Sequence, residues 1–483
     1  MEKSIRKGSR LITDIAACAV WSVFVLIATG CNSALMNPLR LAVLLLGFTG
    51  FACLMVMSAG KSRNEKIIAA VTIIAVAIRT FYVLYTGAQQ RQHDMGEFGI
   101  FHDYNYHSEY IEYLINNHRL LDENIAEHWQ FYHPPLQHIT CAVFFSIYKS
   151  VAPSYGNNWD ALQCLSLFYS LVTLTLAKRF TDLWNLKPKA KTLAYLTVAL
   201  HPQLIVFSGA LNNDPIAVMF AIAALYLTFV WYGEEKKSFA KLMGIGLCVG
   251  LGMMGKLSAG IVAVPIGLVM VKAFFESKKK PVMFLQYVAF MAVCAPLGLW
   301  YQVRSYVLWK VPITYVAKPD LILNPGLIID QPAWKRFLAF GDGVDYNIIT
   351  ETLDAAVFDG DYYRDHTLLA LIGYLLLSVF SVFVITVFAN MVICWIKDRS
   401  FTDLVITVLF LSQLASYVYF CFSYPYTCTM SFRYIVPTVI AGAYYTGRAK
   451  DLSPHLLSLL TTASVYALAV ISLVFYGLVW IKG

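Results

Sequence analysis

The chain has 483 residues, of which 58% are hydrophobic and only 14% are charged, a composition that excludes an ordinary soluble domain. The formal net charge is +8, but the basic residues form short clusters between apolar runs. We interpret these clusters as determinants of membrane orientation and expect no nucleic-acid partner. The ten cysteines include no C-x-x-C pair, which indicates neither a disulfide framework nor a cysteine metal site.

Apolar segments recur along the chain from residue 11 onwards. A bilayer core needs about 20 apolar residues per helix. The pattern therefore predicts an all-α, polytopic membrane protein with about thirteen transmembrane helices. The predicted spans are residues 11–29, 39–59, 66–86, 160–178, 191–209, 215–232, 240–255, 257–274, 281–301, 367–396, 401–421, 432–447 and 455–480.

The orientation follows from seven clusters of lysine and arginine, which the positive-inside rule places on the cytoplasmic side. All seven lie there only if residues 135–152 do not cross the membrane. We therefore predict a re-entrant or interfacial helix for this short segment, which begins after Pro134 and Pro135. The N-terminus is then cytoplasmic and the C-terminus external, in a multi-pass protein of the cell membrane.

We divide the chain into four parts. Residues 1–65 are predicted to form two extra N-terminal transmembrane helices, and residues 66–301 a catalytic transmembrane core that includes an outer loop at 87–159. Residues 302–366 are predicted to form an external loop with short helices on the surface. Residues 367–483 complete the chain with C-terminal transmembrane helices.

The outer loop contains a stretch from Gln90 to His138 that is polar, acidic, histidine-rich and aromatic at once. Its candidate catalytic carboxylates are Asp94 and Asp103, with His93 and His107 as candidate substrate-binding residues. A carboxylate at a partly buried boundary is suited to act as a general base, and a neighbouring histidine can orient its proton. A solvated acidic loop explains the same residue types equally well.

Tyr132 and His133 directly precede two prolines. The prolines fix the backbone, exclude a helix through His133 and start one after it, so the imidazole is held at a defined place. We interpret Tyr132 and His133 as substrate-binding residues. A turn at a helix start would account for the prolines, but not for their position beside the acidic loop.

The turn Asn212-Asn213-Asp214-Pro215 joins two predicted spans on the outer side. It fits ordinary helix-start chemistry, with Asp214 as the N-cap and Pro215 in the first turn. Because the turn opens on the same side as Asp94, we also name Asn213 and Asp214 as candidate substrate-binding residues.

Three cations lie at the outer ends of spans: Lys256, Arg304 and Arg433. Lys256 follows a glycine between two apolar runs with no acidic residue nearby in sequence. Such a lysine can extend its amine to the membrane surface. Three cations on one side favour an anionic ligand, and a phosphate suits them because arginine offers a bidentate fork.

The chain contains no Walker-type glycine-rich loop, no H-E-x-x-H and no G-x-S-x-G motif. It is therefore not evidently an ATPase, a zinc protease or a serine hydrolase. A metal ion bound by Asp94, His133, or Asp214 with Asn213 is possible by ligand type, and the need for a divalent cation stays open.

Several of these elements together resemble the lipid-donor glycosyltransferases of the GT-C superfamily, and particularly family 39. That family contains the protein O-mannosyltransferases and their bacterial relatives. The matching elements are the span end IRTFYVLYTG, His93-Asp94, Tyr132-His-Pro-Pro-Leu136, Asn212-Asn-Asp214, Gly255-Lys-Leu-Ser258, and Phe432-Arg-Tyr434 followed by Pro437. These elements, in their order and spacing, cover roughly residues 66–447. The most specific of them is His-Pro-Pro-Leu after an acidic loop.

The resemblance implies a sugar donor linked to a polyprenyl phosphate, transfer on the outer face of the membrane, and inversion at the anomeric carbon. It also implies that a first-loop aspartate is the catalytic base, which carries over to Asp94, with Asp103 as the rival. The usual Asp-Glu pair of the family is missing, because Met95 follows Asp94 and Tyr104 follows Asp103. No soluble lumenal domain is inserted, which favours a bacterial-type enzyme. The sugar and the acceptor are not implied.

A transporter or flippase for lipid-linked glycans is the alternative, because it would also need outward-facing cations and a groove for lipid. Such a protein is expected to carry charges or broken helices within its spans, and the spans here are nearly free of charge. A scaffold without catalytic activity is a third possibility.

Overall fold

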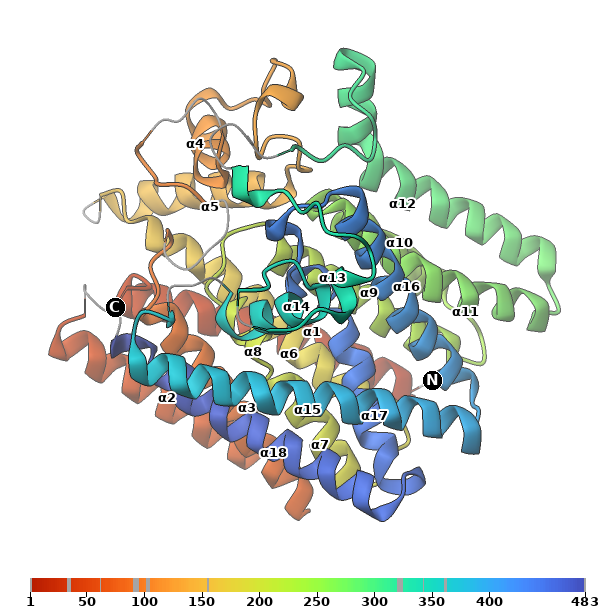
Figure 1. Ribbon diagram of the computed structural model, residues 1–483. Coiled ribbons are helices and arrows are strands. Elements are labelled where there is room, and N and C mark those ends of the chain that lie inside the picture. The colour runs from red at the N-terminus through yellow and green to blue at the C-terminus, as the bar shows by residue number, and fades with distance from the viewer. Residues whose placement is uncertain are drawn as a thin grey trace.

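The computed structural model describes residues 2–32, 36–60, 62–89, 95–100, 105–153, 156–318, 325–341, 343–359 and 363–481. Within these ranges the chain is all-helical, as predicted, and has no strand beyond one isolated bridge between Ile328 and Tyr426. Long helices pack side by side and form the body of the molecule (Figure 1). Two shorter helices, at residues 107–117 and 136–151, lie with their loops at one end of it, at the top in Figure 1.

Ten helices in the described part of the chain are long and apolar enough to cross a membrane. They are α1 (Glu2–Thr29), α2 (Pro38–Ser58), α3 (Arg63–Leu84), α6 (Gln163–Leu183), α9 (Asp214–Tyr232), α11 (Ala263–Glu276) with its preceding 3-10 turn η5 (Leu257–Val262), α12 (Lys280–Trp309), α15 (Thr367–Lys397), α16 (Phe401–Ser423) and α18 (His455–Gly477). The protein is therefore a multi-pass membrane protein.

The predicted count of thirteen spans is not confirmed. The three remaining apolar segments form shorter helices: α7 (Pro188–Ala199) with α8 (Pro202–Val206), α10 (Phe239–Gly255) and α17 (Thr438–Leu452). Pro202 breaks the first of these segments, because it has no N–H to donate and its ring disfavours a helical residue before it. Pro437 similarly delays the start of α17.

The break between α7 and α8 is stabilised by a buried arginine from α3. Arg79 is only 1% exposed, and its guanidinium donates to the carbonyl of Ala199 at 2.7 Å and to the hydroxyl of Ser170 at 3.0 Å. A continuous helix would have paired the Ala199 carbonyl with an amide one turn further on. Arg79 therefore supplies the hydrogen bond that the break removes, which membrane interiors require.

Helices α4 (His107–Asn117) and α5 (Leu136–Val151) pack together at one end of the body (Figure 1). Helix α5 has 16 residues and is not among the ten long helices. Val143, Ile147 and Val151 are exposed along one side of α5, and their spacing of four gives it a continuous apolar face. This amphipathic pattern is what an interfacial helix needs.

The segment at 302–366 contains the short helices that were predicted there. Helix α12 first continues to Trp309, and α13 (Lys335–Leu338) and α14 (Ile348–Phe358) follow. Helix α14 packs against α15, as the neighbouring teal and cyan ribbons in Figure 1 show.

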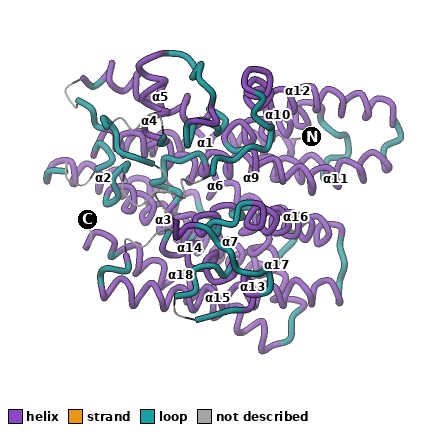
Figure 2. Tube along the Cα trace, turned by 45° about the horizontal axis from the view of Figure 1, so that its top comes forward, coloured by secondary structure: helices purple, strands orange, loops and turns teal. Residues whose placement is uncertain are grey.

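The centre of the body is formed by α6, α7 and α9, and α6 contacts both of the others (Figure 2). In the apolar window of α6 with its preceding turn, 78% of residues are buried, against 6% in α2. Helix α2 therefore lies at the periphery of the body.

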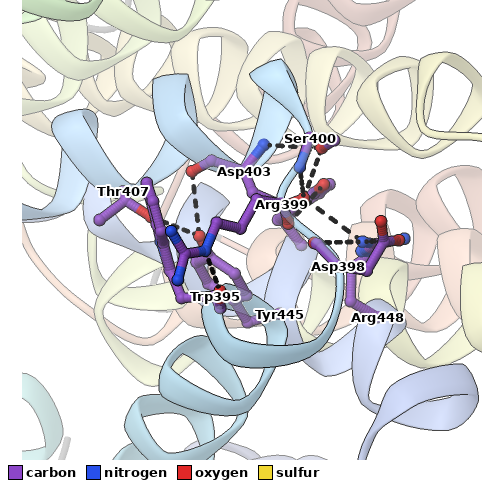
Figure 3. Close-up of polar contacts among 9 residues, drawn as sticks. Trp395, Asp398, Arg399, Ser400, Asp403, Thr407, Tyr445 and Arg448 are labelled. Carbon is purple, nitrogen blue, oxygen red and sulfur yellow. Dashed lines mark hydrogen bonds and ion pairs between the residues drawn. The ribbon is translucent and has the colours of Figure 1, made fainter.

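A polar cluster closes the junction of α15, α16 and α17 (Figure 3). We call it the Asp403 cluster; it consists of Trp395, Asp398, Ser400, Asp403, Thr407, Tyr444, Tyr445 and Arg448. The Asp403 carboxylate is fully buried, and it accepts hydrogen bonds from the Ser400 amide at 2.9 Å and the Tyr444 hydroxyl at 3.0 Å. Arg448 bridges Asp403 and Asp398 at 3.3 and 2.8 Å. The cluster marks the first turn of α16, and the last turns of the same helix reach the candidate site.

Candidate active site

A cavity of about 310 Å³ lies where the ends of several helices meet. Its wall includes the start of α4, the turn before α5, the turn before α9, η5, α12, the segment at 311–316, the end of α16 and the 3-10 turn η9 (Phe432–Tyr434). Six of the predicted site residues line it: His107, Tyr132, His133, Asn213, Lys256 and Arg433. Elements separated by more than 300 residues therefore contribute to one space.

The turn before α9 is tied to the end of α10. Asn213 occupies the N-cap position and donates its side-chain amide to the Gly255 carbonyl at 3.1 Å. The predicted capping role of Asp214 is wrong: Asp214 is the first helical residue, and its carboxylate turns to Lys256 instead. The helix start thus brings two polar residues to the beginning of η5.

Lys256 and Asp214 form a buried ion pair with 2.5 Å between Nζ and Oδ1. The side chain of Lys256 is 13% exposed and that of Asp214 only 3%. Lys256 has no acidic residue nearby in sequence, but the fold brings Asp214 to it across a separation of 42 residues. Lys256 lines both the cavity and a small hollow of about 20 Å³ beside it, whereas Asp214 lines only the hollow, together with Gln413.

Lys256 and Arg433 meet at a shared aromatic ring. The Lys256 amine lies 4.5 Å from the centroid of the Tyr434 ring, and the Arg433 guanidinium carbon lies 5.0 Å from it. Arg433 also donates to the Tyr434 hydroxyl at 3.1 Å. Both cations line the cavity, and the described residues of its wall include no aspartate or glutamate. The described wall is therefore positively charged and suited to an anion.

Three histidines stack behind the cations. His107 begins α4, His133 lies in the turn before α5, and His138 lies in the first turn of α5. The rings of His107 and His133 are 5.6 Å apart, and Nδ1 of His107 lies 2.8 Å from Nε2 of His138. Burial lowers the pKa of all three imidazoles, that of His138 to about 3, and the nearby Lys256 and Arg433 further lower those of His107 and His133. The histidines are neutral near pH 7.

The Tyr132 ring contacts that of His133 at a tilt of 35°, with 4.1 Å between ring centroids, and it meets the Tyr315 ring edge-on at 5.9 Å. Arg304 does not line the cavity. Its guanidinium donates to the Leu121 carbonyl at 2.8 Å and lies 4.9 Å from the Trp309 ring. The structure therefore separates Arg304 from the other two cations, because its position near the end of α12 places it against the outer loop.

Asp94, Asp103 and His93 lie outside the described residues. Among the residues that the structure does describe, no group of three or more His, Cys, Asp or Glu side chains could hold a metal ion.

Several cavity residues were not predicted. They are aromatic or amide side chains from α12, α16 and their flanking loops: Tyr301, Gln302, Tyr315, Tyr417, Phe420, Tyr424 and Tyr434. Tyrosines are concentrated near the outer ends of these spans, and this was the one signal in the sequence. It is a weak signal, because aromatic residues are common at membrane interfaces for other reasons.

A comparison with protein-family models agrees with the sequence resemblance. The model of a family described as dolichyl-phosphate-mannose-protein mannosyltransferase matches residues 132–300. No curated protein sequence matches the chain significantly.

Solved structures of two proteins resemble the structure. ArnT from Cupriavidus metallidurans bound to undecaprenyl phosphate is 13% identical, with a TM-score of 0.49 over 90% of this chain and 77% of that one. The oligosaccharyltransferase AglB from Archaeoglobus fulgidus, in complex with an inhibitory peptide and a dolichol-phosphate, is 11% identical, with a TM-score of 0.48 over 84% and 55%. The predicted resemblance to the GT-C, mannosyltransferase-like glycosyltransferases is confirmed by the family model, over the stretch from Tyr132 to Trp300.

Proposed function

We propose that the protein is a membrane glycosyltransferase that takes a sugar from a polyprenyl-phosphate donor and transfers it, with inversion, to an acceptor on the outer face of the membrane. The observation that carries this proposal is the cavity wall, which joins Lys256 and Arg433 and contains no carboxylate among its described residues. The family match over residues 132–300 supports the same class of reaction.

In this proposal the donor phosphate binds between Lys256 and Arg433. When the bond between the anomeric carbon and the phosphate oxygen breaks, its electron pair passes to the phosphate, and the two cations stabilise the added charge. Asp214 keeps the Lys256 amine at the cavity wall through their ion pair. The role we assign to Asp214 is therefore to position Lys256, while Asn213, His107 and His133 contact the sugar or the phosphate.

The acceptor hydroxyl attacks the anomeric carbon from the opposite side and gives its proton to a carboxylate. We assign this general base to Asp94, with Asp103 as the alternative, on the strength of the family resemblance. A positioned general base contributes about 10²- to 10⁴-fold to a rate. Direct attack in a single displacement inverts the anomeric configuration.

The polyprenyl chain enters from the side, in the region where α12 and α16 both contribute to the cavity wall. Gln302 and Ser305 line the cavity from α12, and Tyr417 and Phe420 line it from α16. The same helices carry exposed apolar side chains nearby, among them Tyr306 and Tyr419. An apolar surface beside an anion site is what a lipid phosphate requires.

The test is an assay of the purified protein with polyprenyl-phosphate sugars labelled in the sugar. Transfer of the label with release of free lipid phosphate is the expected result. Movement of intact donor across a vesicle membrane without its cleavage would instead support a flippase, and neither activity would support a scaffold.

The base is tested with Asp94→Asn and Asp103→Asn, each compared at equal membrane expression with Asp398→Asn from the Asp403 cluster. We expect Asp94→Asn to lower transfer by about 10²-fold or more. Full activity of Asp94→Asn with loss in Asp103→Asn would move the role to Asp103, and full activity of both would remove the general base from this loop.

A further inference from the structure

His138 is a buried imidazole that none of the steps above uses. It is fully buried and does not line the cavity, and among the described residues its ring hydrogen-bonds to His107, with 2.8 Å between Nε2 of His138 and Nδ1 of His107. Its ring also stacks on Tyr110 with 4.1 Å between centroids. The Tyr110 ring also stacks on Phe131, so the His138 imidazole belongs to a packed aromatic group.

A hydrogen bond between two neutral imidazoles needs one N–H and one lone pair, and this leaves two arrangements. In the first, His138 donates from Nε2 and its Nδ1 is a bare lone pair. In the second, His107 donates from Nδ1, and Nδ1 of His138 carries a proton. Burial lowers the pKa of both rings and keeps them neutral, so an arrangement with a doubly protonated imidazole is excluded.

The other nitrogen of His138 decides between these arrangements. Nδ1 of His138 is buried and has no hydrogen-bond partner among the described residues. An orphaned buried N–H is rarer and more costly than an acceptor left unused. The first arrangement avoids an orphaned N–H, so the Nε2–H of His138 donates to His107.

This donation fixes the tautomer of the second ring. Because Nδ1 of His107 accepts, its proton lies on Nε2. Nδ1 faces His138, while His107 itself lines the cavity with 3% of its surface exposed. The nitrogen that remains for a ligand is thus Nε2, as an N–H donor.

We propose that His138 is a positioning residue that locks His107 as a neutral N–H donor toward a ligand oxygen in the cavity. The inference rests on the proposed function for the identity of that oxygen, which belongs to the donor phosphate or to a sugar hydroxyl. His107 then acts as a hydrogen-bond donor and not as a base. Proton removal is left to a carboxylate.

The first test reads the tautomers directly in the full-length protein, labelled with ¹⁵N-histidine and reconstituted in nanodiscs. Long-range ¹⁵N–¹H couplings distinguish Nδ1–H from Nε2–H rings, and His107→Gln and His138→Gln assign the signals among the ten histidines. We expect Nε2–H for both His107 and His138. An Nδ1–H form of His107 would overturn the proposal, whether or not the protein transfers sugar.

The source of the ligand oxygen is read from the same signals. Addition of polyprenyl phosphate without sugar shifts the His107 Nε2–H signal if the partner is the phosphate. A shift that appears only with the complete sugar donor assigns the partner to a sugar hydroxyl. No shift with either compound, under conditions where binding is shown independently, would contradict a donor role.

A matched pair of variants tests the role of His138 in turnover. His138→Gln keeps an N–H near the position of Nε2, whereas His138→Phe keeps the ring that stacks on Tyr110 but removes the donor. We expect His138→Phe to lower kcat/KM for the donor about tenfold, the value of one hydrogen bond, and His138→Gln to retain most of it. Equal loss in two variants of wild-type melting temperature would contradict the tautomer lock, and wild-type protein without transfer activity would contradict only the proposed function.

Discussion

The two ends of helix α16 hold charged residues in different ways. At its first turn, the buried carboxylate of Asp403 accepts hydrogen bonds from Ser400 and Tyr444 and pairs with Arg448 (Figure 3). At its last turns, about 30 Å away along 23 residues, α16 borders a cavity where Lys256 and Arg433 meet. The described wall of that cavity includes no acidic residue.

The balance of charge at the two ends distinguishes a structural cluster from one that is suited to a ligand. The Asp403 cluster contains both signs of charge and joins three helices, so its carboxylates and its arginine pair with one another within the protein. In the cavity, Asp214 compensates Lys256 from outside the wall, and the wall keeps an excess of positive charge. Buried charge of one sign at the edge of a membrane is an expected property of a binding site.

The largest expected effect is that of removing the Lys256 amine. Lys256→Met should lower transfer by at least about 10²-fold, because a cation that stabilises the leaving phosphate is lost. It should also destabilise the fold by about 3–5 kcal/mol, because it leaves the Asp214 carboxylate buried without its partner. Transfer assays and thermal melting in detergent measure the two losses.

The double variant Asp214→Asn/Lys256→Met separates these two losses. It removes both charges, so we expect its melting temperature to recover while its transfer activity stays low. Recovery of activity together with stability would show that Lys256 acts only in the fold.

Arg433 and Arg448 provide a matched pair at the two ends of α16. Arg433→Lys replaces a planar, bidentate donor with a point charge, and we expect the KM for the lipid donor to rise about tenfold. Arg448→Lys should leave KM unchanged. Similar rises in both variants would remove the distinction between the two clusters.

Asp403→Asn tests the structural end directly. The substitution weakens the pair with Arg448, and we expect the free energy of unfolding to fall by about 1–3 kcal/mol. Activity per folded molecule should remain within about twofold of the wild type. A large loss of kcat at unchanged stability would show that this cluster acts in catalysis.

The last expected effect is a pH dependence of stability that comes from the histidines at the cavity end. Burial lowers the pKa of His107, His133 and His138, the last to about 3, from about 6.5 in the unfolded chain. Below about pH 6.5 the unfolded chain therefore binds protons that the folded protein excludes, so stability falls as the pH falls and is constant above that value.

Melting temperatures measured from about pH 8 to about pH 5 should show this decline. His138→Phe should reduce its slope, since one of the three groups is gone, and Asp403→Asn serves as the control with an unchanged set of histidines. Equal slopes in wild type and His138→Phe would show that His138 does not exclude protons in the folded state.

The fold class followed from the sequence because long apolar segments have few alternatives in a membrane. The exact number of spans did not, since residues 191–209 are as apolar as their neighbours but contain Pro202, and the break depends on Arg79 from another helix. The hydrophobicity of a segment indicates that it lies in the membrane. Whether the segment forms one continuous helix depends also on its contacts with other helices.

The candidate site was predicted in part. Short motifs indicated His107, His133, Asn213, Lys256 and Arg433, and these residues line one cavity. The partner of Lys256 was missed because Asp214 had a sufficient local explanation as a helix cap. His138 was named only as the last residue of the polar stretch from Gln90, because nothing in a linear sequence shows that its ring meets that of His107.

The ion pair between Asp214 and Lys256 has a consequence for the binding of inhibitors. An immobilised lysine has already lost its rotamer freedom during folding, and ordering such a side chain on binding costs roughly 0.5–1.5 kcal/mol. An anion that arrives at this amine avoids that entropic loss. A stable lipid phosphonate, which keeps the negative oxygens but cannot release its sugar, should therefore bind the resting protein without any rearrangement of Lys256.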